Sequence, residues 1–228
     1  WLVVTAEKGW ARNEVYVKDL LKNEEFFPLV EKVDALFQVT PRDDRFFVVT
    51  NDGAPRFKVM TVDLHKWDRK EWKTTIPESK DALESAAPIG DWLIATYLHK
   101  ATGRMKLFKK DGTFLRDIAL PPYVSVSGLA GEAGGSELYF SLQSYTMPPS
   151  ILRLDLRAAA MRDEEPAAWQ QLQSPVDPKK FRVEQVEFPS KDGTKITMFI
   201  IGPGGSAQSG PRPTVLYGYG GFNIAMTP

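Results

Sequence analysis

The chain has 228 residues, a formal net charge of zero, and 43% hydrophobic and 11% aromatic residues. This composition supports one large folded domain, or parts of two, and excludes an intrinsically disordered chain. The balanced charge argues against a general binder of nucleic acids or anionic membranes, and the lack of cysteine excludes disulfides and cysteine-bound zinc.

The beginning and the end of the chain predict a piece of a longer protein. The first residues, "WLVVTAEKGW", have the character of a strand interior, and the last, "NIAMTP", follow a glycine-rich stretch. We therefore draw nothing from the lack of a signal peptide. No apolar run approaches the roughly 18 residues that a membrane-spanning helix needs, so we expect no contact with a membrane.

Four apolar runs rich in β-formers recur along the first two thirds of the chain. They are "WLVVTA" at 1–6, "RFFVVTN" at 45–51, "DWLIATYL" at 91–98 and "ELYFSL" at 137–142. Their centres lie at intervals of 45, 46 and 46 residues, at Val3, Val48, Ile94 and Phe140. A repeat of about 45 residues that holds several short strands is the size of one four-stranded propeller blade. Residues 1–175 are therefore predicted to form four blades of a β-propeller, with these runs buried on both faces.

A second run follows each of the first ones and keeps the same period. These runs are "EVYVKDL", "FKVMTVDL", "MKLFKKDG" and "ILRLDL", and their aspartates are spaced by 44, 48 and 44 residues at Asp19, Asp63, Asp111 and Asp155. Alternating polar and apolar residues predict more exposed strands. Aspartates at strand ends are expected to cap turns rather than to bind metal.

The pattern changes after a charged, proline-containing stretch at 161–180, which is predicted to be a linker. "RVEQVEFPS", "KDGTK" and "ITMFIIG" then predict a β-hairpin. After a loop, "TVLYGYGG" is almost wholly apolar, as is typical of a central strand in a buried parallel sheet. Residues 176–228 are therefore predicted to be a linker and the opening strands of an α/β-hydrolase domain.

The stretch "YGYGGFN" at 217–223 lies where an α/β-hydrolase carries part of its oxyanion hole. Glycines allow a backbone to approach a substrate closely and to adopt positive φ angles. A tyrosine at this place can donate its hydroxyl to the developing oxyanion, a contribution of roughly 3–4 kcal/mol for one good donor. The stretch is therefore predicted to lie at the edge of an active site.

"FPSKDGTKITMFIIG" followed by "PTVLYGYGGFNIAMTP" resembles the start of the peptidase domain in the prolyl oligopeptidase family of serine peptidases. "TNDGAPRFKV", "SYTMPPSILRLDL" and the blade period extend the resemblance over essentially the whole chain. In that family a seven-bladed propeller covers an α/β-hydrolase active site. Oligopeptidase B relatives carry "YGYGSY" at this place, so Gly221 and Phe222 favour the prolyl-specific branch.

The resemblance implies roles for particular residues of this chain. Tyr219 would be the side-chain donor to the oxyanion, and Phe222 would line the S1 pocket that holds the substrate proline. Asn223 and Gly220 would shape the turn. Trp10, in the hairpin "TAEKGWARNEVYV", would contribute to the S3 wall. Glu7 stands where the family usually has an arginine, so no substrate-anchoring role is carried over to it.

A serine peptidase also needs a nucleophile, a general base and an acid. No Gly-x-Ser-x-Gly motif occurs in the 228 residues. The two histidines, His65 and His99, are expected to be surface or loop residues, and no spacing suggests a metal site. The catalytic serine, aspartate and histidine are therefore expected outside this sequence, and this chain alone is predicted to be inactive.

Several aromatic residues are expected to have structural roles. Trp67 and Trp72 flank a charged loop and are expected to pack on blade edges. Tyr145 and Met147, in "SYTMPPS", either face the central cavity or belong to a plain hairpin loop, and the loop is the favoured interpretation.

The leading hypothesis is a serine oligopeptidase that cleaves short proline-containing peptides after proline, without cofactor, metal, nucleic acid or membrane. We expect a monomer in the cytoplasm, with the periplasm or secretion as alternatives. The competing hypotheses are a propeller that binds a partner without catalysis and an oligopeptidase B-like peptidase of different specificity.

Overall fold

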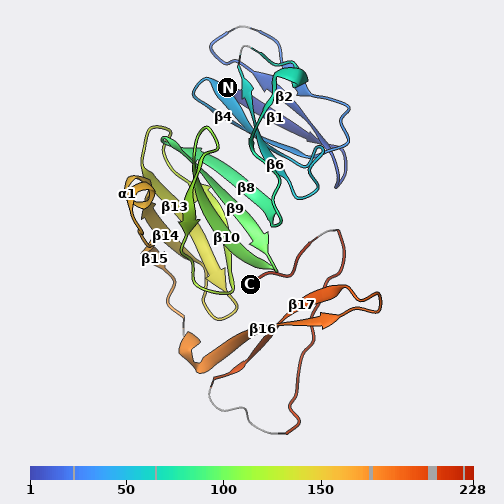
Figure 1. The fold of residues 1–228 in the computed structure, drawn as a ribbon, viewed down its shortest axis with the longest axis vertical. Helices are drawn as coiled ribbons and strands as arrows, with labels where there is room; N and C mark the ends of the chain where they lie inside the picture. The colour runs from blue at the N-terminus through green and yellow to red at the C-terminus, as the bar shows by residue number, and fades with distance from the viewer. Residues whose placement is uncertain (23, 65, 175–176, 205–209, 223) are drawn as a thin grey trace.

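The computed structural model describes residues 1–228 except 23, 65, 175–176, 205–209 and 223. Four antiparallel sheets follow one another along the chain, and each is a meander of neighbouring strands. A separate two-stranded hairpin follows them, and the last residues run back toward the sheets (Figure 1). The expected all-β architecture of open, blade-like sheets is confirmed.

The strand bounds are as follows. The first sheet contains β1 (Leu2–Glu7), β2 (Asn13–Lys18) and β3 (Phe27–Val30). The second contains β4 (Phe37–Arg42), β5 (Arg45–Thr50), β6 (Lys58–Asp63) and β7 (Lys73–Ile76). The third contains β8 (Ala82–Ile89), β9 (Trp92–His99), β10 (Thr102–Lys109) and β11 (Phe114–Ile118). The fourth contains β12 (Val124–Ala130), β13 (Glu137–Ser144), β14 (Ser150–Asp155) and β15 (Ala167–Gln171). The hairpin consists of β16 (Phe181–Pro189) and β17 (Lys195–Pro203), and the one α-helix of the described residues is α1 (Leu156–Met161).

The sequence period coincides with the order of strands in these sheets. The four predicted run centres lie in β1, β5, β9 and β13. Three of these are the second strand of a four-stranded sheet, while β1 is an outer strand of a three-stranded sheet. The strands β1, β2 and β3 therefore correspond to the second, third and fourth strands of the later sheets.

The hydrophobic core lies between neighbouring sheets, and β5 shows how the sequence produces it. Side chains alternate across a strand, so Phe46 and Val48 pack toward the first sheet while Phe47 and Val49 pack toward the third. The strand β9 divides in the same way, with Ile94 facing the fourth sheet. Both strands are thus buried on both faces, as predicted.

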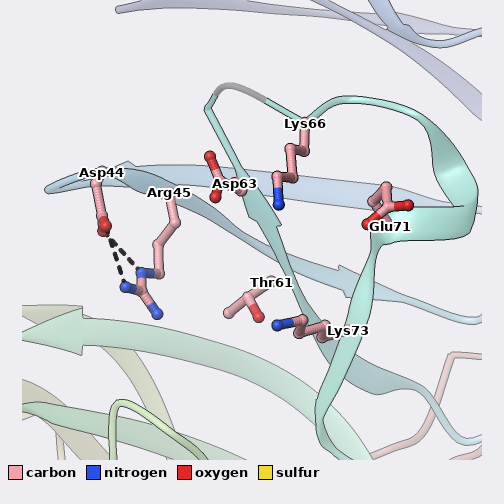
Figure 2. Close-up of a pocket in the computed structure, with 7 residues that line it drawn as sticks. All are labelled: Asp44, Arg45, Thr61, Asp63, Lys66, Glu71 and Lys73. Atoms are coloured by element: carbon pink, nitrogen blue, oxygen red, sulfur yellow. Dashed lines mark hydrogen bonds and ion pairs between the residues drawn. The ribbon is translucent and has the colours of Figure 1, made fainter.

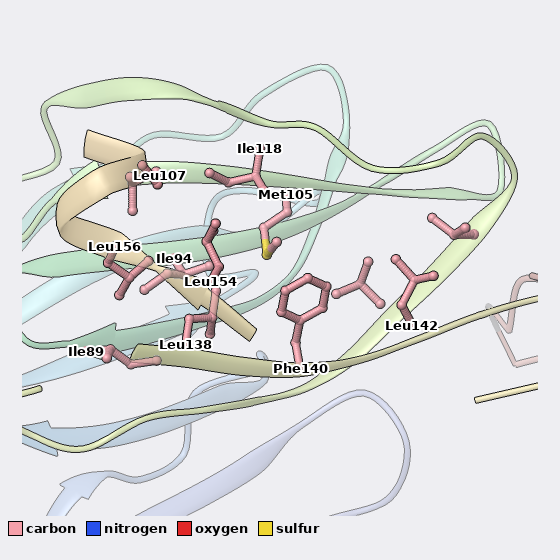
Figure 3. Packing of buried hydrophobic residues seen from close by; sticks show 13 residues of the cluster. Ile89, Ile94, Met105, Leu107, Ile118, Leu138, Phe140, Leu142, Leu154 and Leu156 are labelled. Atoms are coloured by element: carbon pink, nitrogen blue, oxygen red, sulfur yellow. The ribbon is translucent and has the colours of Figure 1, made fainter. Parts of the chain in front are cut away.

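Burial on both faces is not found in β1 and β13, which corrects that expectation. In β13 only alternate residues are buried, among them Phe140, which packs against the third sheet (Figure 3). In β1, Leu2 and Val4 are exposed while Val3 packs against the neighbouring core. The reason is that each outer sheet has only one neighbouring sheet among the described residues.

Three of the four periodic aspartates cap turns, as expected. Asp19, Asp111 and Asp155 each accept a hydrogen bond from the backbone N–H two residues later. Asp155 also accepts a bond from the N–H of Ala158, so it is the N-cap of α1. The bond from Thr113 holds the pKa of Asp111 below its usual value.

The C-terminal third departs from prediction in two places. β15 lies inside the stretch predicted as a linker at 161–180; it pairs with β14, and Trp169 packs on Tyr139 at 5.4 Å. Residues 214–221 are not a strand, and most of their side chains are exposed. A strand needs a hydrogen-bonded neighbour, and among the described residues β16 and β17 pair only with each other. The predicted hairpin itself is confirmed, in register from Phe181 opposite Pro203 to Pro189 opposite Lys195.

Candidate functional site

The residues predicted to form the site come from two distant parts of the chain. Trp10 lies in the β1–β2 loop, and Phe222 lies in the segment that follows the hairpin. Their rings nevertheless lie in contact, with centroids 5.2 Å apart and planes tilted by 39°. Both remain accessible, because 75% of Trp10 and 64% of Phe222 is exposed. The structure thus brings together two of the four predicted site residues.

The backbone around Phe222 has the conformation that the glycine-rich sequence predicts. Gly220 has a φ of 70° and Phe222 a φ of 51°. The N–H of Ile224 donates to the carbonyl of Gly221 at 3.0 Å, which closes a tight turn. Positive φ is ordinary for glycine but uncommon for phenylalanine. Residues held in this region cluster at functional sites, so the turn is a candidate for one.

An open cavity of about 680 Å³ lies between this turn and the second and third sheets. Gly220, Gly221 and Phe222 line one side of it. Phe57, Leu83, Glu84 and Leu98 are among the lining residues from the sheets. Its volume is within the roughly 300–1,000 Å³ of sites that bind small ligands. Most of the lining residues have apolar side chains, and Gln38 and Glu84 are the polar ones.

Tyr219 lies immediately before this turn and is 53% exposed. Within the part of the chain that the structure describes, its hydroxyl makes no hydrogen bond. The group is therefore free to donate to a ligand. Asn223, the fourth predicted residue, lies outside the described residues.

Sequence reasoning missed the contributions of Phe57 and Glu84 to the cavity. Phe57 begins the run "FKVMTVDL" that was predicted to be a strand, but it precedes β6 and has a φ of 66°. Glu84 is displaced by an irregularity in the pairing of β8 with β9. Neither a positive φ at a non-glycine residue nor a bulge has a clear signature in a single sequence.

A buried carboxylate ties the third sheet together on the side of the hairpin. The Asp81 carboxylate is buried; it lies 2.7 Å from Nδ1 of His99 and 3.5 Å from Arg104. Burial, and secondarily the charge of Asp81, raises the pKa of Tyr97 to about 12. His99 is the last residue of β9 and partly buried, not the loop residue expected, while His65 lies outside the described residues. These contacts link β9 and β10 to the segment that leads into β8.

The hairpin contacts the sheets through an aromatic cluster and a few polar groups. Phe199 of β17 lies against Tyr145 and Tyr123, with ring centroids 5.1 and 5.8 Å apart. Burial raises the pKa of Tyr145. Gln185 of β16 donates to the carbonyl of Lys100 at 2.7 Å. Tyr145 therefore belongs to the β13–β14 loop, as favoured, and its ring packs on the hairpin.

Trp72 and Trp67 differ in their surroundings. Trp72 is buried in the core between the first two sheets, which corrects the expectation that it packs on an edge. Its indole N–H donates to the carbonyl of Trp67 at 3.2 Å, and the guanidinium of Arg69 stacks on its ring. Trp67 is partly buried, against Phe27. The charged loop between the two tryptophans therefore covers the core.

A second, smaller cavity lies on the second sheet and is lined mainly by charged side chains (Figure 2). Arg45 donates two hydrogen bonds to Asp44, at 2.9 and 3.2 Å, and this pairing lowers the pKa of Asp44. Lys66, Glu71 and Lys73 complete a lining of mixed sign. None of the predicted site residues lies here, and mixed charges on a sheet surface are typical of a solvated face.

Among the residues that the structure describes, no helix is long and apolar enough to span a bilayer. In the same part of the chain, no three histidine, aspartate or glutamate side chains are grouped so that they could hold a metal ion.

Comparison with known proteins gives consistent results. Residues 1–163 match the family described as prolyl oligopeptidase, N-terminal beta-propeller domain. The chain is 32% identical over 229 residues to a prolyl endopeptidase of Elizabethkingia meningoseptica, covering 100% of this chain and 32% of that protein. It is 30% identical over 192 residues to a dual function macrocyclase-peptidase of Galerina marginata, and the match covers 83% of this chain and 26% of that protein.

Solved structures show the same relationship. A prolyl endopeptidase, studied for the role of inter-domain dynamics in catalysis and specificity, superposes with a TM-score of 0.87 at 34% identity, over 99% of this chain and 32% of that one. Prolyl oligopeptidase B of Galerina marginata, bound to a 35mer substrate, superposes with a TM-score of 0.72 at 25% identity. The superposition covers 87% of this chain and 29% of that one. The chain thus spans about a third of the length of these relatives.

Proposed function

Because the chain belongs to the prolyl oligopeptidase family, we propose that the whole protein is a serine-type oligopeptidase that cleaves short peptides after proline. The observation that carries this proposal is the contact of Trp10 with Phe222 beside the open cavity. It joins the β1–β2 loop of the first sheet to the glycine-rich turn, and Phe222 of that turn also lines the cavity. A proline ring has the size and polarity to pack on such an aromatic wall.

In the proposed mechanism a serine attacks the carbonyl carbon of the proline, and a histidine accepts its proton as general base. Both would come from the two thirds of the protein beyond this chain. The Tyr219 hydroxyl would donate to the oxyanion, and Phe222 would hold the proline. Trp10 would line the adjacent S3 wall, and Asn223 and Gly220 would shape the turn.

We also propose that residues 176–228 open an α/β-hydrolase domain and that the four sheets are blades of a seven-bladed propeller. The hairpin supports the first point, because Phe188, Ile196, Ile200 and Ile201 are all exposed. A hairpin with this much exposed apolar surface is suited to packing against further structure. A monomeric state and a cytoplasmic location stay predictions.

The alternative of a binding module without catalysis is not favoured, since relatives that match the entire chain are prolyl endopeptidases. An oligopeptidase B-like peptidase of different specificity would instead cleave after a residue other than proline. The hypotheses can be distinguished by measuring which quenched peptides the full-length protein cleaves, when the peptides carry proline, arginine or alanine before the cleaved bond. We expect cleavage after proline and labelling of a serine by a fluorophosphonate probe.

Replacement of Tyr219 tests the proposed oxyanion donor within that assay. Tyr219→Phe in the full-length protein is expected to lower kcat by roughly 10²–10³-fold, the usual loss for one oxyanion donor. Tyr217→Phe is the matched control, because Tyr217 is also exposed and lies two residues away. Equal turnover in the two variants would remove Tyr219 from the mechanism. Absence of any peptide cleavage by the unmodified protein would overturn the proposed function.

A further inference from the structure

Glu84 occupies an irregular position in β8. The pairing of β8 with β9 is regular on either side, with Leu83 opposite Tyr97 and Ser85 opposite Thr96. Because Tyr97 and Thr96 are consecutive, Glu84 has no partner of its own and is the extra residue of a β-bulge. Bulges frequently occur next to active sites, where they redirect a side chain.

The bulge lies in a stretch of β8 where three consecutive residues line the same cavity. Leu83 is buried in the core between the second and third sheets. Glu84 lines the cavity opposite the turn that carries Phe222. In a regular strand, consecutive side chains would point to opposite faces. Here Ala82, Leu83 and Glu84 all reach the cavity.

The electrostatic surroundings of Glu84 are unusual for an exposed carboxylate. It is the one charged side chain among the described residues that line the cavity. No hydrogen bond or ion pair joins it to any other residue that the structure describes. Desolvation by nearby protein atoms raises its pKa although the residue is exposed overall, and no neighbouring cation opposes the effect. A cation that enters the cavity would therefore stabilise the charged form of this unpaired carboxylate.

Resting on the function proposed above, we propose that Glu84 is a specificity residue that selects peptides carrying a positively charged nitrogen near the proline held by Phe222. The nitrogen belongs either to a lysine or arginine side chain or to the free amino terminus of the peptide. A charge-assisted hydrogen bond from either group would satisfy the unpaired carboxylate.

The test uses the full-length protein and matched pairs of internally quenched peptides. One series is acetylated and carries lysine, or its neutral counterpart norleucine, at successive positions before the proline. A second series compares a free with an acetylated amino terminus on an otherwise neutral peptide. We expect one series to show a kcat/KM about tenfold higher for the cationic member, the usual scale of a hydrogen bond to a charged group. The series that shows it identifies the source of the nitrogen.

Glu84→Gln is expected to reduce this ratio to within about twofold of unity, and Glu84→Lys to bring it below unity. Glu165→Gln, an exposed acid in the connection between α1 and β15, is the control and should keep the ratio. Equal kcat/KM within every pair, or an unchanged ratio in Glu84→Gln, would overturn the inference. Peptide affinities are measured in parallel by fluorescence anisotropy. If no peptide is cleaved, the proposed function fails, while a lysine preference that Glu84→Gln removes from binding still supports the role of Glu84.

Discussion

The strand β5 and the segment at 214–221 are both apolar and rich in β-formers, yet the first is buried in a sheet and the second is largely exposed and forms no strand. Phe46, Phe47 and Val48 of β5 are fully or almost fully buried. Val215 and Leu216 are 92% and 86% exposed, and no strand forms around them. The difference lies in the neighbours, because β5 has a hydrogen-bonded strand on each side and a sheet against each face. Apolar composition alone therefore does not decide whether a segment is buried. Burial also requires neighbouring strands to pair with and neighbouring sheets to pack against.

Under the proposed function, this contrast would separate the residues that stabilise the fold from those that recognise the substrate. The interfaces between the sheets hold the buried side chains, while the exposed C-terminal segment carries Tyr219 and Phe222. The cavity forms where the C-terminal segment lies against the second and third sheets.

A pair of truncations tests the contrast directly. Phe47→Ala is expected to lower the local free energy of opening in β5 by about 3–5 kcal/mol, the usual cost of a phenylalanine-sized cavity. Leu216→Ala is expected to change it by less than about 0.5 kcal/mol, as exposed positions do. Native-state hydrogen exchange of the β5 and β9 amides in the full-length protein measures both. A similar effect of the two variants would show that the exposed segment also supports the sheets.

Phe199→Ala probes the contact that holds the hairpin to the sheets. Loss of the aromatic pairs with Tyr123 and Tyr145 is expected to cost about 0.5–1.5 kcal/mol beyond the lost burial. Amides of β16 and β17 should then exchange faster, while those of β5 keep their protection. Faster exchange throughout the four sheets would mean that the hairpin is part of their core.

The smallest effect concerns the pH dependence that Glu84 adds to stability. Its folded-state pKa is raised by burial, so the native state binds more protons than the unfolded state between the two pKa values. Stability therefore falls as the pH rises through that window, and the penalty is fully present above it. Glu84→Gln is expected to remove this part of the pH dependence from the exchange of β8 and β9 amides. An identical profile in the variant would show that the carboxyl is fully solvated.

Much of the repeating architecture could be predicted from sequence, because it follows from local chemistry. The period of apolar runs located β5, β9 and β13, and aspartates at strand ends predicted the caps at Asp111 and Asp155. Each of these features depends on a short stretch of chain. The hairpin of β16 and β17 was predictable for the same reason, from alternation around a Lys-Asp-Gly turn.

What could not be predicted depends on contacts between distant segments. "AAWQQ" forms β15 because it pairs with β14, and Trp72 is a core residue because it packs against Phe37 among the buried side chains between the first two sheets. The cavity combines residues that are more than 100 positions apart. Trp10 and Phe222 were expected at one site through the resemblance to a family, and the bulge at Glu84 had no signature in the sequence.

The most direct test of the account is whether Trp10 and Phe222 act together on the substrate. In the full-length protein, kcat/KM for a quenched proline peptide is measured for Trp10→Ala, Phe222→Ala and the double variant. Because the two rings are in contact, the account predicts that the two losses are not additive, with a coupling of about 0.5–1.5 kcal/mol. Strictly additive losses, or no loss in either single variant, would contradict a peptide site shared by the sheets and the C-terminal segment.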